Sequence, residues 1–178
     1  DYSRLQNPTR EHLEKTVASL ENGIDALAFS SGMAAITLMM ELFKPGDHLI
    51  VDADLYGGSI RLFNHVSEKN GIEFSSVDCY KENIEGYIRE NTKAIYIETP
   101  TNPMMNVTDI KALSEITKKH NLLLIVDNTF LSPYFQNPLK LGADVVIHSG
   151  TKFLGGHNDT LAGFIVTSNE EIQEKLSF

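Results

Sequence analysis

Short apolar runs alternate with amphipathic stretches along almost the whole chain. The apolar runs are bounded by turn residues, as expected of buried strands, whereas the stretches between them have helical spacing. The runs predict strands at 26–29, 48–51, 73–77, 94–97, 122–126, 145–147 and 163–166. The intervening stretches predict helices at 33–42, 60–66, 84–89 and 110–120. This alternation favours a mainly parallel sheet with helices on both faces.

A further helix is expected near the start of the chain. Asn7 is a good capping residue, and the proline that follows it suits a first helical turn. Leu13, Val17 and Leu20 recur at helical spacing and would form an apolar face, and Gly23 would terminate the helix.

The pattern contains no repeat or linker, so residues 1–178 are expected to form one domain. Hydrophobic residues make up 42% of the chain and charged residues 22%, an ordinary globular composition. The chain opens on Asp1 rather than Met and stops at Phe178, within an apparent amphipathic helix. We therefore expect it to be part of a longer protein.

Charge and cysteine content narrow the function classes. A net charge of −9 provides no electrostatic footprint for nucleic acid or an anionic membrane. The single cysteine, Cys79, cannot form an internal disulfide, and we interpret it as a small core residue. We find neither a signal peptide nor a membrane-spanning run, so we expect a cytoplasmic location.

A carboxylate and a lysine follow two of the predicted strands. Asp127 follows 122–126, and Lys152 follows 145–147. The carboxyl ends of parallel strands meet at one edge of a sheet, where ligands bind. Pyridoxal phosphate requires such a pair, a lysine for the Schiff base and an acid for the ring nitrogen. Either residue alone would more simply be a loop lysine or a helix-capping carboxylate.

Two segments could hold a phosphate group. Ser31 and Gly32 follow the first strand and open a helix, whose N–H groups and dipole favour anions. A serine N-cap is an equally good interpretation of that segment. Ser149 and Thr151 offer hydroxyls beside Lys152. The absence of a P-loop or Gly-x-Gly-x-x-Gly pattern disfavours a nucleotide ligand.

Other polar and aromatic residues also follow predicted strands. Tyr56 comes after the second strand and is placed to stack on an aromatic ring, although a core or surface tyrosine is the alternative. Asn102 lies in a loop whose two prolines fix its direction. His148 and His157 flank the lysine segment without metal-ligand spacing, so we predict no metal site.

Six motifs, spread over the whole chain, match those of one known family. The chain resembles the cysteine/methionine-metabolism family of pyridoxal-phosphate enzymes, which includes cystathionine γ-synthase, cystathionine β- and γ-lyases, methionine γ-lyase and homoserine-ester sulfhydrylases. The motifs occur in family order at residues 2–10, 30–35, 54–58, 98–103, 126–130 and 148–152.

The resemblance implies the fold and domain organisation. It implies a three-layer α/β/α domain, like the large domain of aspartate-aminotransferase-like (fold type I) enzymes. Residues 1–178 would be that pyridoxal-phosphate-binding domain. The family's N-terminal segment would be absent, as would the small C-terminal domain that carries the arginine for the substrate carboxylate.

The resemblance also assigns roles around the cofactor ring. Lys152 would carry the cofactor and move protons, and Tyr56 would stack on the ring and assist proton transfer. Asp127 would pair with the ring nitrogen, Thr129 would support the ring, and Asn102 would contact its 3-oxygen.

Further roles concern the phosphate and the assembly. The phosphate would be held by Gly32, Met33, Ser149 and Thr151. Tyr2 and Arg4 would reach the phosphate of a neighbouring subunit, which implies an active site at the interface of a homodimer or homotetramer.

The activity implied is the making or breaking of a C–S bond at the β- or γ-carbon of cystathionine, cysteine or a homoserine ester. The alternatives are another fold type I pyridoxal-phosphate reaction and a non-catalytic cofactor-binding fragment. Gly58 stands where methionine γ-lyases typically have cysteine, which argues mildly against that activity.

Overall fold

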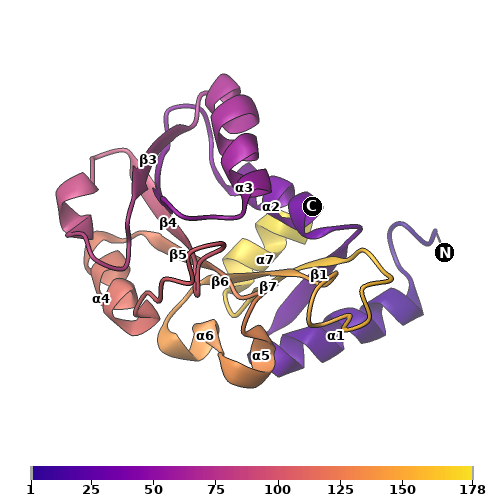
Figure 1. Ribbon diagram of the computed structural model, residues 1–178. Coiled ribbons are helices and arrows are strands. Elements are labelled where there is room, and N and C mark those ends of the chain that lie inside the picture. Colours follow the sequence, from indigo (N-terminus) through magenta and orange to yellow (C-terminus); the bar gives the residue numbers. More distant parts are fainter. Residues whose placement is uncertain (1, 178) are drawn as a thin grey trace.

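The computed structural model describes residues 2–177, and a seven-stranded sheet runs through its centre (Figure 1). All the predicted strands are present, with ends shifted by two residues at most. Their bounds are β1 Asp25–Phe29, β2 His48–Asp52, β3 Glu73–Val77, β4 Thr92–Glu98, β5 Leu123–Asp127, β6 Val145–Ser149 and β7 Gly163–Thr167.

The sheet is mainly parallel, as predicted. Its strand order is β1-β7-β6-β5-β4-β2-β3. Strand β7 runs antiparallel to both of its neighbours, β1 and β6, and the remaining pairs are parallel. The carboxyl ends of β4, β5 and β6 therefore lie together at one edge.

Helices cover both faces, which confirms the three-layer α/β/α architecture (Figure 1). One face carries α2 (Gly32–Met39), α3 (Gly57–Leu62) and α7 (Glu170–Ser177). The other carries α1 (Pro8–Glu21), α4 (Ile110–His120), α5 (Ser132–Phe135) and α6 (Pro138–Leu141). Four shorter turns are η1 (Met40–Leu42), η2 (Phe63–Ser67, π-helical), η3 (Glu68–Asn70) and η4 (Ile84–Tyr87).

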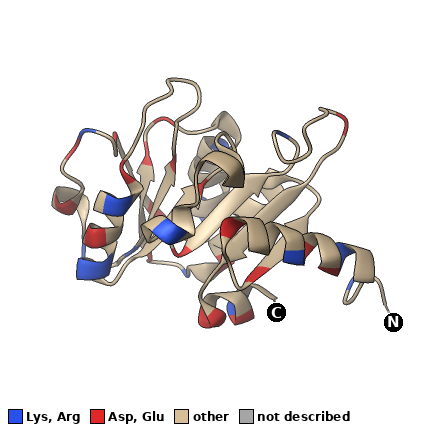
Figure 2. Ribbon diagram, turned by 90° about the horizontal axis from the view of Figure 1, so that it is seen from below, with Lys and Arg blue, Asp and Glu red and all other residues tan. Residues whose placement is uncertain are grey.

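The sheet is buried on both faces, and its residues alternate between a core on the α2 side and two cores on the other face, one against α4 and one against α1. In β4, Ala94 and Tyr96 pack on the α2 side, whereas Ile95 and Ile97 pack on the α4 side. Burial on both faces explains why the strands appear as continuous apolar runs. Charged residues lie mainly on the helices and loops (Figure 2). Cys79 is buried in the core against α4, as predicted, and burial raises the pKa of its thiol.

The start of α1 is as predicted, but its buried face is not. The side chain of Asn7 accepts hydrogen bonds from the first turn of the helix. Val17 is buried, but Leu13 and Leu20 are 44% and 51% exposed, so the predicted apolar face is wrong. The face that packs on the sheet instead includes Glu21, which is completely buried.

The end of α1 also differs from the prediction. The left-handed residue that ends the helix is Asn22 (φ 63°), not Gly23. Gly23 serves close packing, because a Cβ there would lie 2.4 Å from a methyl group of Val166 in β7.

The helix predicted at 84–89 is only one 3₁₀ turn, Ile84–Tyr87. The segment is short and contains Gly86, and the chain becomes extended at Ile88. No helix among residues 2–177 is long and apolar enough to cross a bilayer.

Candidate active site

A cavity of about 500 Å³ opens beyond the carboxyl ends of β4, β5 and β6, beside the start of α2. This position is where ligands bind in open α/β sheets. The cavity is lined by Ser31, Gly32, Met33, Ile36, Tyr56, Glu98, Asn102, Asp127, Thr129, Phe130, Ser149, Thr151, Lys152, Phe153, Gly156, Asn158 and Leu161.

Most of the site residues singled out in the sequence lie together around this cavity. They are Gly32, Met33, Tyr56, Asn102, Asp127, Thr129, Ser149, Thr151 and Lys152. Tyr2 and Arg4 do not line it: they lie in the exposed segment before α1, where Tyr2 is 70% exposed. Arg10 holds this segment through hydrogen bonds to the carbonyl oxygens of Ser3, Arg4 and Leu5.

Asp127 is a buried carboxylate of the cavity, at the last position of β5. Its Oδ1 accepts hydrogen bonds from the Thr129 hydroxyl (2.5 Å) and the Thr129 backbone N–H (3.0 Å). The same hydroxyl oxygen accepts the Ser149 backbone N–H at 2.8 Å. Thr129 therefore joins the end of β5 to the end of β6.

The pKa of Asp127 reflects opposing effects. Burial raises it, whereas the hydrogen bonds from Thr129 and the positive charge of His148 lower it. An adjacent cation in the cavity would favour the ionised form further. A protonated ring nitrogen is such a cation.

The start of α2 and the end of β6 form an anion cradle. Ser31 caps the helix by accepting the Ala34 N–H at 3.1 Å. A Cβ at Gly32 would lie 2.9 Å from the Cβ of Ser149, so the two segments approach as closely as they do only because residue 32 is glycine. This juxtaposition places helix N–H groups beside the Ser149 hydroxyl.

Lys152 lines the same cavity from the loop after β6. Its backbone N–H donates to the Ser149 carbonyl oxygen (3.3 Å), and its own carbonyl accepts the Gly156 N–H (2.8 Å). Thr151 is tied to Ala162 by a hydrogen bond from the Ala162 N–H to its hydroxyl oxygen (3.2 Å). Backbone contacts thus fix the loop, while the lysine side chain is exposed to the cavity.

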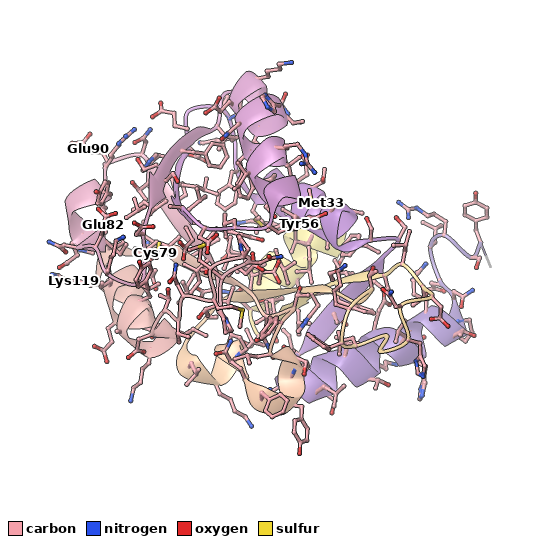
Figure 3. The ribbon with its side chains drawn as sticks, viewed as in Figure 1. Met33, Tyr56, Cys79, Glu82, Glu90 and Lys119 are labelled. Carbon is pink, nitrogen blue, oxygen red and sulfur yellow. The ribbon has the colours of Figure 1, made fainter. Side chains whose placement is uncertain are left out.

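Tyr56 immediately precedes α3, and its ring lies beside Met33 of α2 (Figure 3). The ring is 47% exposed and lines the cavity, an arrangement open to stacking by a ligand. Its interpretation as a core residue is therefore wrong.

Asn102 belongs to a loop anchored by Asp54. The Asp54 carboxylate accepts hydrogen bonds from the Thr101 hydroxyl (2.5 Å) and the Met104 N–H (3.0 Å). The loop is thereby held over the end of β4, with Asn102 at the cavity wall.

Sequence reasoning gave no role to Glu98, although it belongs to one of the motifs. It ends β4 and lines the cavity, and its Oε2 accepts the Tyr56 backbone N–H at 2.9 Å. Burial, with a further contribution from the charge of Asp127, raises the pKa of Glu98 to about 8. Its place at the end of a buried strand was the signal available in the sequence.

No group of three His, Cys, Asp or Glu side chains suitable for a metal occurs among residues 2–177. His157 is exposed, with Nδ1 near the Gly155 carbonyl oxygen, and His148 is buried away from solvent.

The fold and cavity define an α/β domain with a ligand pocket at the carboxyl ends of its parallel strands. The sequence profile of the family described as "Cys/Met metabolism PLP-dependent enzyme" matches residues 1–178, and the chain belongs to that family. The family implies pyridoxal 5′-phosphate as cofactor.

Among curated relatives, the chain is 55% identical to cystathionine gamma-synthase/O-acetylhomoserine (thiol)-lyase of Bacillus subtilis, over 99% of this chain and 48% of that protein. It is 54% identical to cystathionine gamma-lyase of the same organism, over 100% of this chain and 47% of that protein. The crystal structure of cystathionine gamma-lyase from Lactobacillus plantarum complexed with L-serine has a TM-score of 0.98 and 47% identity, over 99% of this chain and 47% of that one. The chain thus spans about half the length of these relatives.

The cavity fits this cofactor on its own chemistry. The cradle at Gly32 and Ser149 suits a phosphate, Asp127 suits a protonated ring nitrogen, and Lys152 suits an aldehyde carbon. Tyr56 provides an exposed aromatic face for a planar ring.

Proposed function

We propose that the protein is a pyridoxal-phosphate-dependent enzyme of sulfur amino-acid metabolism, acting in transsulfuration and in methionine or cysteine synthesis. It would make or break a C–S bond at the β- or γ-carbon of cystathionine, cysteine or a homoserine ester. The observation that carries the proposal is the single cavity that brings Lys152, Asp127 and the Gly32–Ser149 cradle together. The names of the relatives support the reaction class.

Lys152 would hold the cofactor through Nζ and, once displaced by the substrate amine, remove the α-proton. Bound pyridoxal phosphate supplies an electron sink for negative charge at the substrate α-carbon. Asp127 would keep the ring nitrogen protonated, and Thr129 would hold that carboxylate in place. Asn102 would contact the ring's 3-oxygen.

Binding would rest on the remaining residues of the cavity. Gly32 and Met33 would offer N–H groups to the phosphate, and Ser149 and Thr151 would offer hydroxyls. Tyr56 would stack on the ring and assist proton transfer.

The reaction type within the family stays open between lyase and transferase, because the identities to the synthase and the lyase differ by only one percentage point. We further propose that residues 1–178 serve as the large cofactor-binding domain. In the assembled homodimer or homotetramer, Tyr2 and Arg4 would reach a partner's cofactor. The one cysteine, buried and free, supports a reducing, cytoplasmic location.

The test uses the full-length protein loaded with pyridoxal phosphate. Borohydride reduction followed by peptide mapping should place the pyridoxyl group on Lys152, and Lys152→Ala should carry none. Assays with cystathionine and homoserine esters should then show carbon–sulfur chemistry. A label on another lysine would refute the site. A protein that stays colourless with the cofactor would support the alternative of a non-catalytic fragment. Turnover only by transamination would support the alternative of another fold type I pyridoxal-phosphate reaction.

A further inference from the structure

A second polar cluster lies beneath the cavity, on the α1 face of the sheet. It centres on Glu21 at the end of α1 and His148 in β6, both of which are completely buried. The two side chains meet at 2.5 Å between Glu21 Oε1 and His148 Nε2. Buried charged groups are rare unless they are paired, so this contact requires an explanation.

The cluster is connected to the strand ends that carry the site. Glu21 Oε1 also accepts a hydrogen bond from Asn128 Nδ2 at 2.7 Å, and Asn128 directly follows Asp127. His148 directly precedes Ser149 of the cradle. Glu21 thus links the ends of β5 and β6 on the α1 face of the sheet, as Thr129 links them beside the cavity.

Two buried polar atoms of the cluster lack hydrogen-bond partners in the described part of the chain. Among residues 2–177, neither Glu21 Oε2 nor His148 Nδ1 has a hydrogen-bond partner. A fully buried carboxylate with one bare oxygen is strongly unfavourable unless a cation lies against it. Of the two side chains that contact Glu21 Oε1, Asn128 is neutral and His148 can carry a positive charge.

We propose that Glu21 and His148 form a buried charge pair that acts on the cofactor site through Asp127. Glu21 holds the His148 ring in place through this contact, and a positive charge on His148 stabilises the Asp127 carboxylate from the opposite face of the sheet. Both are positioning residues, since neither lines the cavity. The inference rests on the proposed function, in which Asp127 pairs with the ring nitrogen of the cofactor.

Two other ionisable side chains lie close to Asp127. Tyr96 lies 3.5 Å from Asp127 Oδ2, and Glu98 lies at the end of the neighbouring strand β4. Neither carries positive charge. The charge of His148 opposes the effect of burial on the pKa of Asp127. Together with the hydrogen bonds from Thr129, which have the larger effect, His148 therefore offsets the desolvation of that carboxylate.

The test compares the full-length wild type with His148→Gln, Glu21→Gln and the double variant. Glutamine places Nε2 near the position of the histidine Nε2, so the contact keeps its shape and loses its charge. Two quantities are measured: the dissociation constant of pyridoxal phosphate as a function of pH, and the free energy of unfolding of the cofactor-free protein.

His148→Gln should bind pyridoxal phosphate roughly tenfold more weakly at pH 7, since Asp127 loses a stabilising positive charge. Glu21→Gln should weaken binding in the same direction, since the His148 ring loses its charged contact. The loss of binding on the acid side should move to higher pH, because Asp127 then protonates more readily. His148→Gln should also destabilise the fold by leaving the buried Glu21 carboxylate without an opposite charge beside it. The double variant should be more stable than His148→Gln but should bind the cofactor no more tightly. If the pair had a purely structural role, stability and affinity would recover together.

His48 provides a matched control. It is completely buried at the start of β2 and hydrogen-bonded to Thr92 and Ser75, at the opposite edge of the sheet from the cavity. His48→Gln should lower stability and leave the affinity unchanged within about twofold. Wild-type affinity in His148→Gln, or recovery of affinity in the double variant, would overturn the inference. A wild type that binds no pyridoxal phosphate would instead overturn the proposed function, and the inference with it.

Discussion

The backbone N–H of Tyr56 donates a 2.9 Å hydrogen bond to the carboxyl group of Glu98. The aromatic ring at the mouth of the cavity is therefore positioned from the end of a different strand, β4. Because Glu98 is buried and close to Asp127, its pKa is raised to about 8, and it is mainly protonated at neutral pH.

Glu98→Gln should reduce the pH dependence of stability. In the unfolded chain Glu98 titrates near 4.5, so the folded state retains a proton that the unfolded state releases. The contribution of protonated Glu98 to the free energy of unfolding is complete below pH 4.5 and is lost as the pH rises through about 8. The free energy of unfolding should fall by on the order of a few kcal/mol over this range. Urea denaturation of the cofactor-free protein between pH 4 and 9 measures it.

Glutamine cannot lose a proton, so the free energy of unfolding of Glu98→Gln should fall less over this range than that of the wild type. Glu115, an exposed residue of α4, provides the control, and Glu115→Gln should follow the wild-type curve. Equal pH slopes in Glu98→Gln and the wild type would contradict the raised pKa.

Asp127→Asn should leave the fold intact and reduce turnover of the full-length enzyme by roughly a hundredfold or more. A neutral amide cannot balance the charge of a protonated ring nitrogen. Steady-state kinetics with cystathionine measures the loss. Asp109, the N-cap of α4, provides a control, because asparagine caps helices equally well. Near-normal turnover in Asp127→Asn would rule out the role given to this carboxylate.

Gly58→Ala should weaken cofactor binding several-fold without destabilising the fold. A Cβ there would lie 2.4 Å from Cε1 of Tyr56 and 2.9 Å from Sδ of Met33, so the ring must move. Alanine is otherwise the better residue for helix α3. Gly57→Ala is the matched control in the same helix, since its nearest contact would be 3.8 Å away at Arg61. Cofactor titration and thermal unfolding should separate the two variants, and equal affinities would show that the position of Tyr56 does not matter.

Arg4→Ala should weaken cofactor binding in the partner's site, because its guanidinium suits phosphate oxygens and lies outside its own cavity. At a cofactor concentration too low to load Arg4→Ala, mixing Arg4→Ala and Lys152→Ala subunits should restore up to about a quarter of wild-type activity, since a hybrid dimer contains one intact site. Sedimentation should show a dimer or tetramer. An active monomer, or no recovery on mixing, would disprove the shared site.

Much of the fold follows from local sequence. Helix α4 has the predicted bounds because strong periodicity lies between good caps, Asp109 and Asn121. Most of the site residues meet because each follows a strand or opens a helix at the same edge of the sheet. That geometry is a property of parallel sheets and needs no knowledge of side-chain packing.

The remaining features depend on contacts between distant segments. Leu13 and Leu20 suggested an apolar face for α1, but the helix turns so that Glu21 faces the sheet and meets His148, 127 residues away. Nothing near Glu21 in the sequence marks it as buried. Likewise, the raised pKa of Glu98 arises from the folded neighbourhood, and the reversed direction of β7 is set by its pairing with β1 and β6.

The position of β7 has a consequence for how the protein is synthesised. Strand β1 has β7 as its only neighbour in the sheet, and Asp25 pairs with Thr167. A growing chain that has left the ribosome as far as Lys152 already contains every residue assigned to the cofactor. It nevertheless lacks the strand that fastens β1, and with it α2, to the rest of the sheet. The α2 half of the phosphate cradle is therefore translated well before the strand that β1 pairs with, and it reaches its final place only after that strand has been made.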